Sequence, residues 1–195
     1  MYSSPDRFLE HVPPGYLRDW VWNNVLPIKQ TAKAAVFAMW QGILAQHAAW
    51  LNGQKGGKRA DLSGWDFSAL GIVNLDGVDL SRAILTGAKL KGINIRGAKF
   101  TGAKLNNADL HNSDLSDSDL SSADLRNAIL SGANLRRSNL QNVNATKATF
   151  SGAAMFDADI AGAKGREIAV AFSRGFFGSD KALTQMRREL TLIRP

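Results

Sequence analysis

A strict five-residue period runs through more than half of this chain. In the stretch ADLHNSDLSDSDLSSADLRNAILSGANL, residues 108–135, a large apolar residue recurs at every fifth position, and a small residue stands two places before it. An α-helix repeats every 3.6 residues and a β-strand every 2.0, so neither could keep these side chains on one buried face. The period therefore predicts a chain that turns a corner in every repeat.

The same phase extends in both directions from this stretch over nineteen repeats. Ala or Ser fills most of the positions two places before the large residue, which predicts a second inward position with little room. Asp, Asn, Ser, Gly, Lys and Arg fill most other positions and suit exposed turns. The large positions are Leu70, Leu75, Leu80, Leu85, Leu90, Ile95, Phe100, Leu105, Leu110, Leu115, Leu120, Leu125, Leu130, Leu135, Leu140, Ala145, Phe150, Met155 and Ile160.

Two earlier units follow the same pattern out of phase. ADLSG around Leu62 and WDFSA around Phe67 are offset by three residues from the later repeats. An offset of this kind requires extra chain between the two phases. We therefore expect a loop or bulge near residues 68–73.

The A(D/N)LXX pattern of these repeats resembles the pentapeptide-repeat proteins. It is seen at Ala108-Asp109-Leu110 and Ala133-Asn134-Leu135, and the likeness covers about residues 60–165. The resemblance implies a mainly β fold, a right-handed quadrilateral β-solenoid of about five coils with four units in each. The family hosts many roles, so the resemblance is specific for the fold and not for the function.

A coil of twenty residues makes a testable demand on the charges. Positions twenty apart would stack at about 4.8 Å, the spacing between neighbouring strands. Opposite charges facing each other at that spacing would help to fix the register of the coils. At the position just before the large residue, a lysine lies twenty residues from an aspartate in three cases: Lys89 and Asp109, Lys99 and Asp119, and Lys104 and Asp124. Asp79 lies twenty residues before Lys99 and would face it from the other side.

The net charge of +7 lies outside the repeats. Residues 60–165 hold eleven basic and eleven acidic side chains, whereas residues 1–59 carry a net +4 and residues 166–195 a net +3. A neutral rod gives no electrostatic footprint for nucleic acid, so nucleic acid is not expected as a partner.

The flanks predict helices around the solenoid. We divide the chain into a Trp-rich α-helical segment (1–58), the solenoid (59–165) and a helical C-terminal cap (166–195). Residues 16–26 form an amphipathic pattern, and Pro27 can open a longer helix that runs to about Leu51. The C-terminal stretches 166–177 and 180–190 read as short helices that cover the last coil. The family resemblance offers a homodimer contact through them as the alternative.

An apolar run in the N-terminal segment leaves three interpretations open. Residues 34–51 contain no Asp, Glu, Lys or Arg. This run of eighteen residues is at the lower limit of the length that spans a membrane. Gln41, Gln46 and His47 suit a bilayer poorly. The run could pack on its own solenoid, dock on a partner protein or associate with a membrane surface. We expect a cytoplasmic protein, with membrane association as the alternative.

Residues that carry catalysis or hold metals are not evident. The chain has no cysteine, and His11, His47 and His111 lack metal-ligand spacing. The linker after residue 51 departs from a phosphate-binding P-loop, because Asn52 replaces its first glycine and Arg59 its hydroxyl. The acidic residues from 109 to 124 ring the coil and do not converge as a calcium site requires. We therefore expect no enzyme, no cofactor and no bound metal.

These features predict a scaffold, adaptor or accessory subunit whose rigid solenoid positions its helical flanks against a protein partner or a larger complex. Tryptophans supply anchors of the kind that dominate interfaces, and arginines on one side of the rod suit phosphate or carboxylate groups, with Asp117 between them. The alternative is a regulator of a type II topoisomerase that imitates DNA, as some members of the family do, which the neutral rod and basic flanks disfavour. The candidate partner-binding residues are Trp20, Trp22, Trp40, Trp50, Arg96, Arg136 and Arg137.

Overall fold

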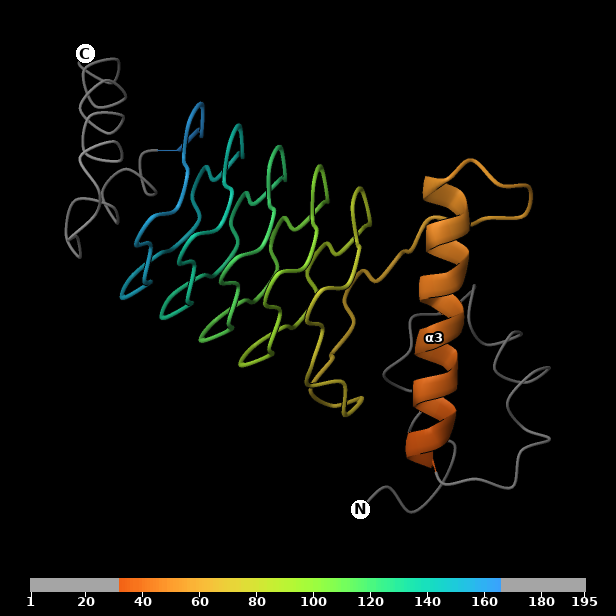
Figure 1. Ribbon diagram of the computed structural model, residues 1–195. Coiled ribbons are helices and arrows are strands. Elements are labelled where there is room, and N and C mark those ends of the chain that lie inside the picture. Colours follow the sequence, from red (N-terminus) through yellow and green to blue (C-terminus); the bar gives the residue numbers. More distant parts are fainter. Residues whose placement is uncertain (1–31, 166–195) are drawn as a thin grey trace, which may run out of the picture.

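The computed structural model describes residues 32–165 (Figure 1). Helix α3 (Ala32–Leu51) comes first, and a loop leads from it into a stack of five-residue units between Asp61 and Lys164. The helices expected at 16–26, 166–177 and 180–190 lie outside the described residues.

The stacked units repeat with a period of twenty residues. Parallel β-bridges join residues twenty apart, from Asn74 with Asn94 to Asn144 with Lys164. Four five-residue units therefore complete each coil, as expected. Only one residue in five forms a bridge, because the chain turns after every one. The sides of the described coils are single-residue bridges, not the continuous strands that a mainly β fold would suggest.

The first coil contains the expected insertion. Its bridges join Asp61 to Ile84 and Asp66 to Lys89, twenty-three residues apart instead of twenty. The three additional residues are taken up by a turn at 67–71, which confirms the loop predicted near 68–73. Leu70 was assigned to the regular series, and this was wrong: its side chain is buried, but it lies within that turn, where its backbone N–H donates to Asp66 O (3.1 Å).

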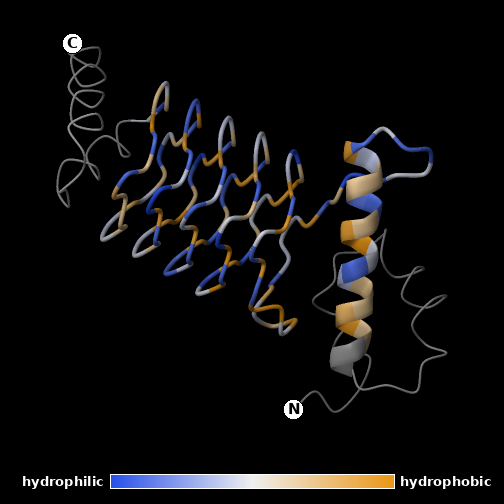
Figure 2. Cartoon of the chain, in the orientation of Figure 1, coloured by the Kyte–Doolittle hydropathy of each residue, from blue (hydrophilic) through white to orange (hydrophobic). Residues whose placement is uncertain are grey.

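Large and small inward positions build the core in alternation. The large side chains from Leu75 to Leu140 are 0% exposed, and the small ones lie beside them, as the pattern predicts. Ser replaces Ala at three small positions, and each hydroxyl donates to the carbonyl three residues earlier, for example Ser118 Oγ to Leu115 O (2.6 Å). Figure 2 shows the resulting alternation of hydrophobic and hydrophilic segments around the coils.

Asp or Asn precedes the large residue in many repeats and in most of these has a local role in the turn. Its side-chain oxygen accepts a hydrogen bond from the backbone N–H two residues later, as Asp114 does from Ser116 (3.0 Å) and Asp119 from Ser121 (2.9 Å). This Asx turn favours a corner. One residue further on, the backbone enters the left-handed region, where Asn, Asp and Gly are tolerated best; Asn127 has φ 57° and Gly132 φ 70°.

The predicted lysine and aspartate pairs are in register, but their side chains do not all pair as expected. Bridges align Lys89 with Asp109, Lys99 with Asp119 and Lys104 with Asp124. The ion pairs described for these residues are made to the preceding coil or within one unit, and the pair of Lys99 with Asp79 is the flanking contact that the sequence predicted. These ion pairs are Lys89 with Asp66 (3.4 Å), Lys99 with Asp79 (4.0 Å) and Arg126 with Asp124 (2.6 Å).

Helix α3 covers the N-terminal end of the solenoid and shares its core. Val36, Met39 and Trp40 are buried in one hydrophobic cluster with side chains of the first coil. The rings of Trp40 and Phe67 meet edge to face, with 5.7 Å between centroids and 88° between planes. Of the three interpretations of residues 34–51, the structure shows packing on its own solenoid. No helix in the described part of the chain is both long enough and apolar enough to cross a bilayer.

Candidate functional site: an apolar groove beside helix α3

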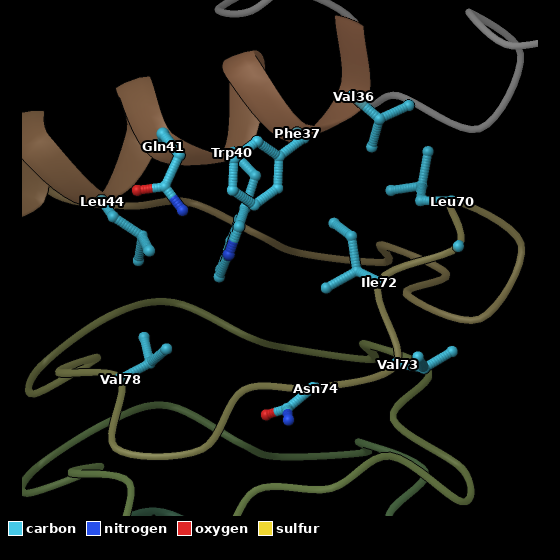
Figure 3. A pocket seen from close by; sticks show the side chains of 11 residues that line it. Val36, Phe37, Trp40, Gln41, Leu44, Leu70, Ile72, Val73, Asn74 and Val78 are labelled. Carbon is cyan, nitrogen blue, oxygen red and sulfur yellow. The ribbon is translucent and has the colours of Figure 1, made fainter. Parts of the chain in front are cut away.

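A groove of about 340 Å³ lies between α3 and the start of the solenoid (Figure 3). One wall comes from residues 36–44 of the helix and the other from the inserted segment and the chain that follows it as far as Val78. The residues that line it are Val36, Phe37, Trp40, Gln41, Leu44, Leu70, Gly71, Ile72, Val73, Asn74 and Val78.

The helical wall follows from residue spacing. Val36, Trp40 and Leu44 are four residues apart and therefore lie along one edge of α3. Val36 and Trp40 also reach the shared core, whereas Phe37, one position around the helix, is 63% exposed. A phenylalanine side chain that stays mostly exposed beside a packed helix edge contributes little to the stability of its own chain.

The solenoid wall follows from the insertion. Val73 stands two places before Leu75, the position that Ala or Ser fills in most other repeats. Because the chain emerges from the turn at 67–71, Ile72 is buried and Val73 is 59% exposed. Phe37 and Val73 are thus the two most exposed large apolar side chains of the described residues, and both border this groove.

The groove carries no charge. Gln41 and Asn74 are the polar side chains of its lining, and Asn74 Oδ1 already accepts a hydrogen bond from the N–H of Asp76 (2.7 Å). A surface of this kind binds by hydrophobic contact and lacks the paired acids, bases or nucleophiles that catalysis requires. No group of three His, Cys, Asp or Glu side chains suited to a metal occurs within residues 32–165.

The two predicted tryptophan anchors that the structure describes, Trp40 and Trp50, do not form one surface. Trp40 borders the groove, although only 4% of it is exposed. Trp50 lies ten residues further along α3, about 15 Å at 1.5 Å per residue. Its ring stacks on His47, with 5.6 Å between centroids. Trp20 and Trp22 lie outside the described residues.

The predicted arginines lie at one corner of the solenoid, where two of them share an acid. Arg96 Nε and Arg137 Nε lie 3.1 Å and 2.6 Å from the carboxylate oxygens of Asp117. The hydrogen bond from Arg137 is the main reason that the pKa of Asp117 falls below its usual value. Asp117 therefore offsets part of the positive charge at this corner. Arg136 is exposed beside it, and a partner-binding role for the three arginines stays a prediction.

Sequence reasoning missed Phe37 and Val73. A signal existed for Val73, because a branched residue at the small position directly after a phase break indicates an irregular unit. No comparable signal existed for Phe37: the run around it is apolar in every direction, so its exposure depends on which side of α3 meets the solenoid.

Comparisons with known proteins agree with the repeat architecture. The pentapeptide-repeat family matches eight copies over residues 73–102, 93–132 and 133–164. Members of this family fold as right-handed quadrilateral β-helices, and the described coils of this chain likewise take four five-residue units each. A comparison with curated proteins finds no match.

Several solved structures resemble the chain. HetL of the cyanobacterium Nostoc, a pentapeptide-repeat protein involved in the regulation of heterocyst differentiation, is 29% identical over 54% of this chain and 55% of its own, with a TM-score of 0.41. This chain thus aligns with about half the length of HetL. Rfr23 of the cyanobacterium Cyanothece is 27% identical over 56% of this chain and 79% of its own (TM-score 0.34).

A third similar structure comes from a plant. It is a pentapeptide-repeat protein of the Arabidopsis thaliana thylakoid lumen, 29% identical over 69% of this chain and 90% of its own, with a TM-score of 0.30. The period of five, the coil of twenty and the matches from residue 73 to 164 lead to one assignment: the repeat region of this chain, residues 73–164, belongs to the pentapeptide-repeat family.

Proposed function

We propose that this chain is a non-enzymatic adaptor whose solenoid presents the groove beside α3 to the apolar side of an amphipathic helix from another protein. The observation that carries the proposal is the pair Phe37 and Val73, exposed at 63% and 59% on the two walls of one groove. A solvent-facing apolar patch with this arrangement is typical of an interaction site.

The lining defines the chemistry of the occupant. A charged side chain placed in a groove without charged partners would lose hydration and gain no compensating ion pair. An apolar helix face, with anchors three or four residues apart, would bury Phe37 and Val73 without that cost. Gln41 and Asn74, the polar side chains of the lining, can form hydrogen bonds with polar groups at the edge of the bound helix.

The shared core supports an adaptor with fixed geometry. Both walls join the same hydrophobic cluster through Val36, Trp40, Leu70 and Ile72, so the groove exists before any partner arrives. A site that is already formed spends less binding free energy on ordering its own side chains. The neutral, regular coils behind it act as a spacer between this end and the C-terminal flank.

Site-specific photo-crosslinking in cells tests the proposal. A photoreactive phenylalanine analogue replaces Phe37 or Val73 in the groove, and Ile129 or Phe156, which are exposed elsewhere on the solenoid, serve as matched controls. We expect the two groove positions to capture the same protein and the two controls to miss it. Mass spectrometry of the adduct then identifies the crosslinked segment, which should be an amphipathic helix.

Other outcomes contradict the groove. Adducts at Ile129 and Phe156 alone would place binding on the solenoid sides, as a topoisomerase regulator would require. Adducts with lipid at Phe37 would favour a membrane surface. A failure of both groove positions to crosslink any protein would also count against the proposal, because each side chain projects directly from the proposed contact.

A further inference from the structure

His47 joins three segments at the far end of α3. The residue is 0% exposed, although histidine is a polar residue on an otherwise apolar helix face. Its Nδ1 accepts a hydrogen bond from the backbone N–H of Ala60 (3.1 Å), which lies just before the first coil. Its Nε2 lies 3.1 Å from the carbonyl oxygen of Ser81, in the next turn of the solenoid.

These two contacts fix the protonation state. A backbone N–H can only donate, so Nδ1 must keep its lone pair, and a carbonyl can only accept, so Nε2 must carry the proton. The imidazole that satisfies both partners is neutral. A second proton on Nδ1 would set two N–H groups against each other and break the hydrogen bond to Ala60.

The charged neighbours of His47 also oppose a second proton. Arg59 in the linker and Arg82 in the solenoid place their guanidinium groups 5.7 Å and 4.8 Å from the centre of the Trp50 ring, which stacks on the imidazole. Arg59 Nε also donates to the carbonyl of Arg82, which keeps the two cations together. Asp79 is the charged neighbour that favours protonation, and it also faces Lys99 across a bridge.

We propose that His47 is a pH-sensitive latch whose protonation releases the C-terminal end of α3 from the solenoid. The released helix would carry Trp50 away from the two arginines, and the first coil would lose part of its cover. The latch stands on the hydrogen bonds and the cluster of cations, and it is independent of what binds in the groove.

The direction of the pH effect follows from linkage. Burial, the largest cause, lowers the pKa of His47 below the usual 6.5. The attached state therefore binds fewer protons than the released state, in which the imidazole would titrate near 6.5. Attachment is strongest above about pH 6.5 and weakens as the pH falls toward the lowered pKa. Within that window the equilibrium shifts toward release by up to about tenfold per pH unit.

Release would alter the groove, because α3 forms one of its walls. This consequence rests on the proposed function: a partner held beside Phe37 would bind less tightly at acidic pH. The latch itself can be measured without a partner, so failure of one proposal does not decide the other.

Hydrogen exchange of the full chain between pH 7.5 and pH 5, corrected for the intrinsic pH dependence of amide exchange, tests the latch. We expect protection in residues 41–51 to fall with the pH while protection in the central coils stays constant. His47→Asn retains an oxygen that can accept from Ala60 and cannot titrate, so its α3 protection should not change with pH. His111→Asn, at a partly exposed position in the solenoid, is the matched control and should behave like the wild type.

Two results would overturn the latch: constant protection of α3 in the wild type, or a pH response that survives in His47→Asn. If that variant does not fold, nitrogen-detected NMR of the wild type decides the question. The expected spectrum at pH 7.5 shows a neutral His47 ring with its proton on Nε2 and a pKa below 6.5. A ring protonated on Nδ1 at that pH, or a pKa above 6.5, would refute the proposal.

Discussion

Replacing Trp40 with alanine should destabilise the N-terminal end of this protein far more than the rest of it. Trp40 is 4% exposed, and its ring meets Phe67 edge to face within the core that α3 shares with the solenoid. Truncation of a buried tryptophan costs about 3 to 5 kcal/mol. About 0.5 to 1.5 kcal/mol of this loss can be assigned to the aromatic pair, beyond the burial of its surface.

The loss should remain local because of the repeat architecture. In a solenoid each coil contacts mainly its neighbours, so stability is close to a sum of repeat and interface contributions. We therefore expect Trp40→Ala to increase hydrogen exchange in α3 and in residues 60–75 by two orders of magnitude or more. The central coils, from residue 95 to residue 140, should keep their protection.

Phe37→Ala supplies the matched control on the same helix. Phe37 is 63% exposed, so this variant should stay within about 0.5 kcal/mol of the wild type. Equal exchange in the wild type and Trp40→Ala would refute the shared core. A uniform loss of protection from α3 to the last described coil would refute the local transmission of stability.

Three further changes probe the coils. Ser118→Ala should change the urea midpoint little, because the carbonyl of Leu115 still accepts a hydrogen bond from the backbone N–H of residue 118 (3.2 Å). A fall of more than about 1 kcal/mol in the free energy of unfolding, measured by urea titration, would contradict this. Ala123→Leu should lower the free energy of unfolding by about 1 to 3 kcal/mol through overpacking, again measured by urea titration. An unchanged free energy of unfolding would contradict a tight second inward position. Asp117→Asn should differ slightly from the wild type at neutral pH, because the hydrogen bond from Arg137 stabilises the ionised carboxylate and lowers its pKa. The difference should shrink as the pH falls from about 3.8 toward the lowered pKa and vanish below it; an acid-unfolding curve checks this, and a difference that grows at low pH would contradict it.

The repeat architecture was predictable because its signals are local. A large residue such as Leu110 is buried for the same reason in every coil, and each corner uses its own Asp, Asn or Gly. Since four units close one coil, the register followed from counting. Leu70 was misassigned because a count of five backward from Leu75 falls on a leucine, although the three inserted residues have already ended the regular phase.

The groove and the His47 contacts were not predictable in the same way. Helix α3 has no charged side chain from residue 34 onward, so no polar face indicated which side would meet the solenoid. The exposure of Phe37 depends on that choice. His47 likewise acquires its partners from Ala60 and Ser81, thirteen and thirty-four residues away, through a packing that no local pattern specifies.

The most direct test of the proposed function is the affinity of the purified partner, once crosslinking has identified it, for Phe37→Ser and Phe156→Ser variants of the full chain. Both residues are exposed phenylalanines, and only Phe37 borders the groove. Loss of an anchor residue costs about 2 kcal/mol, which is about thirtyfold in Kd. We predict that loss for Phe37→Ser and an unchanged Kd for Phe156→Ser, whereas equal affinities of the two variants would contradict the groove as the docking site.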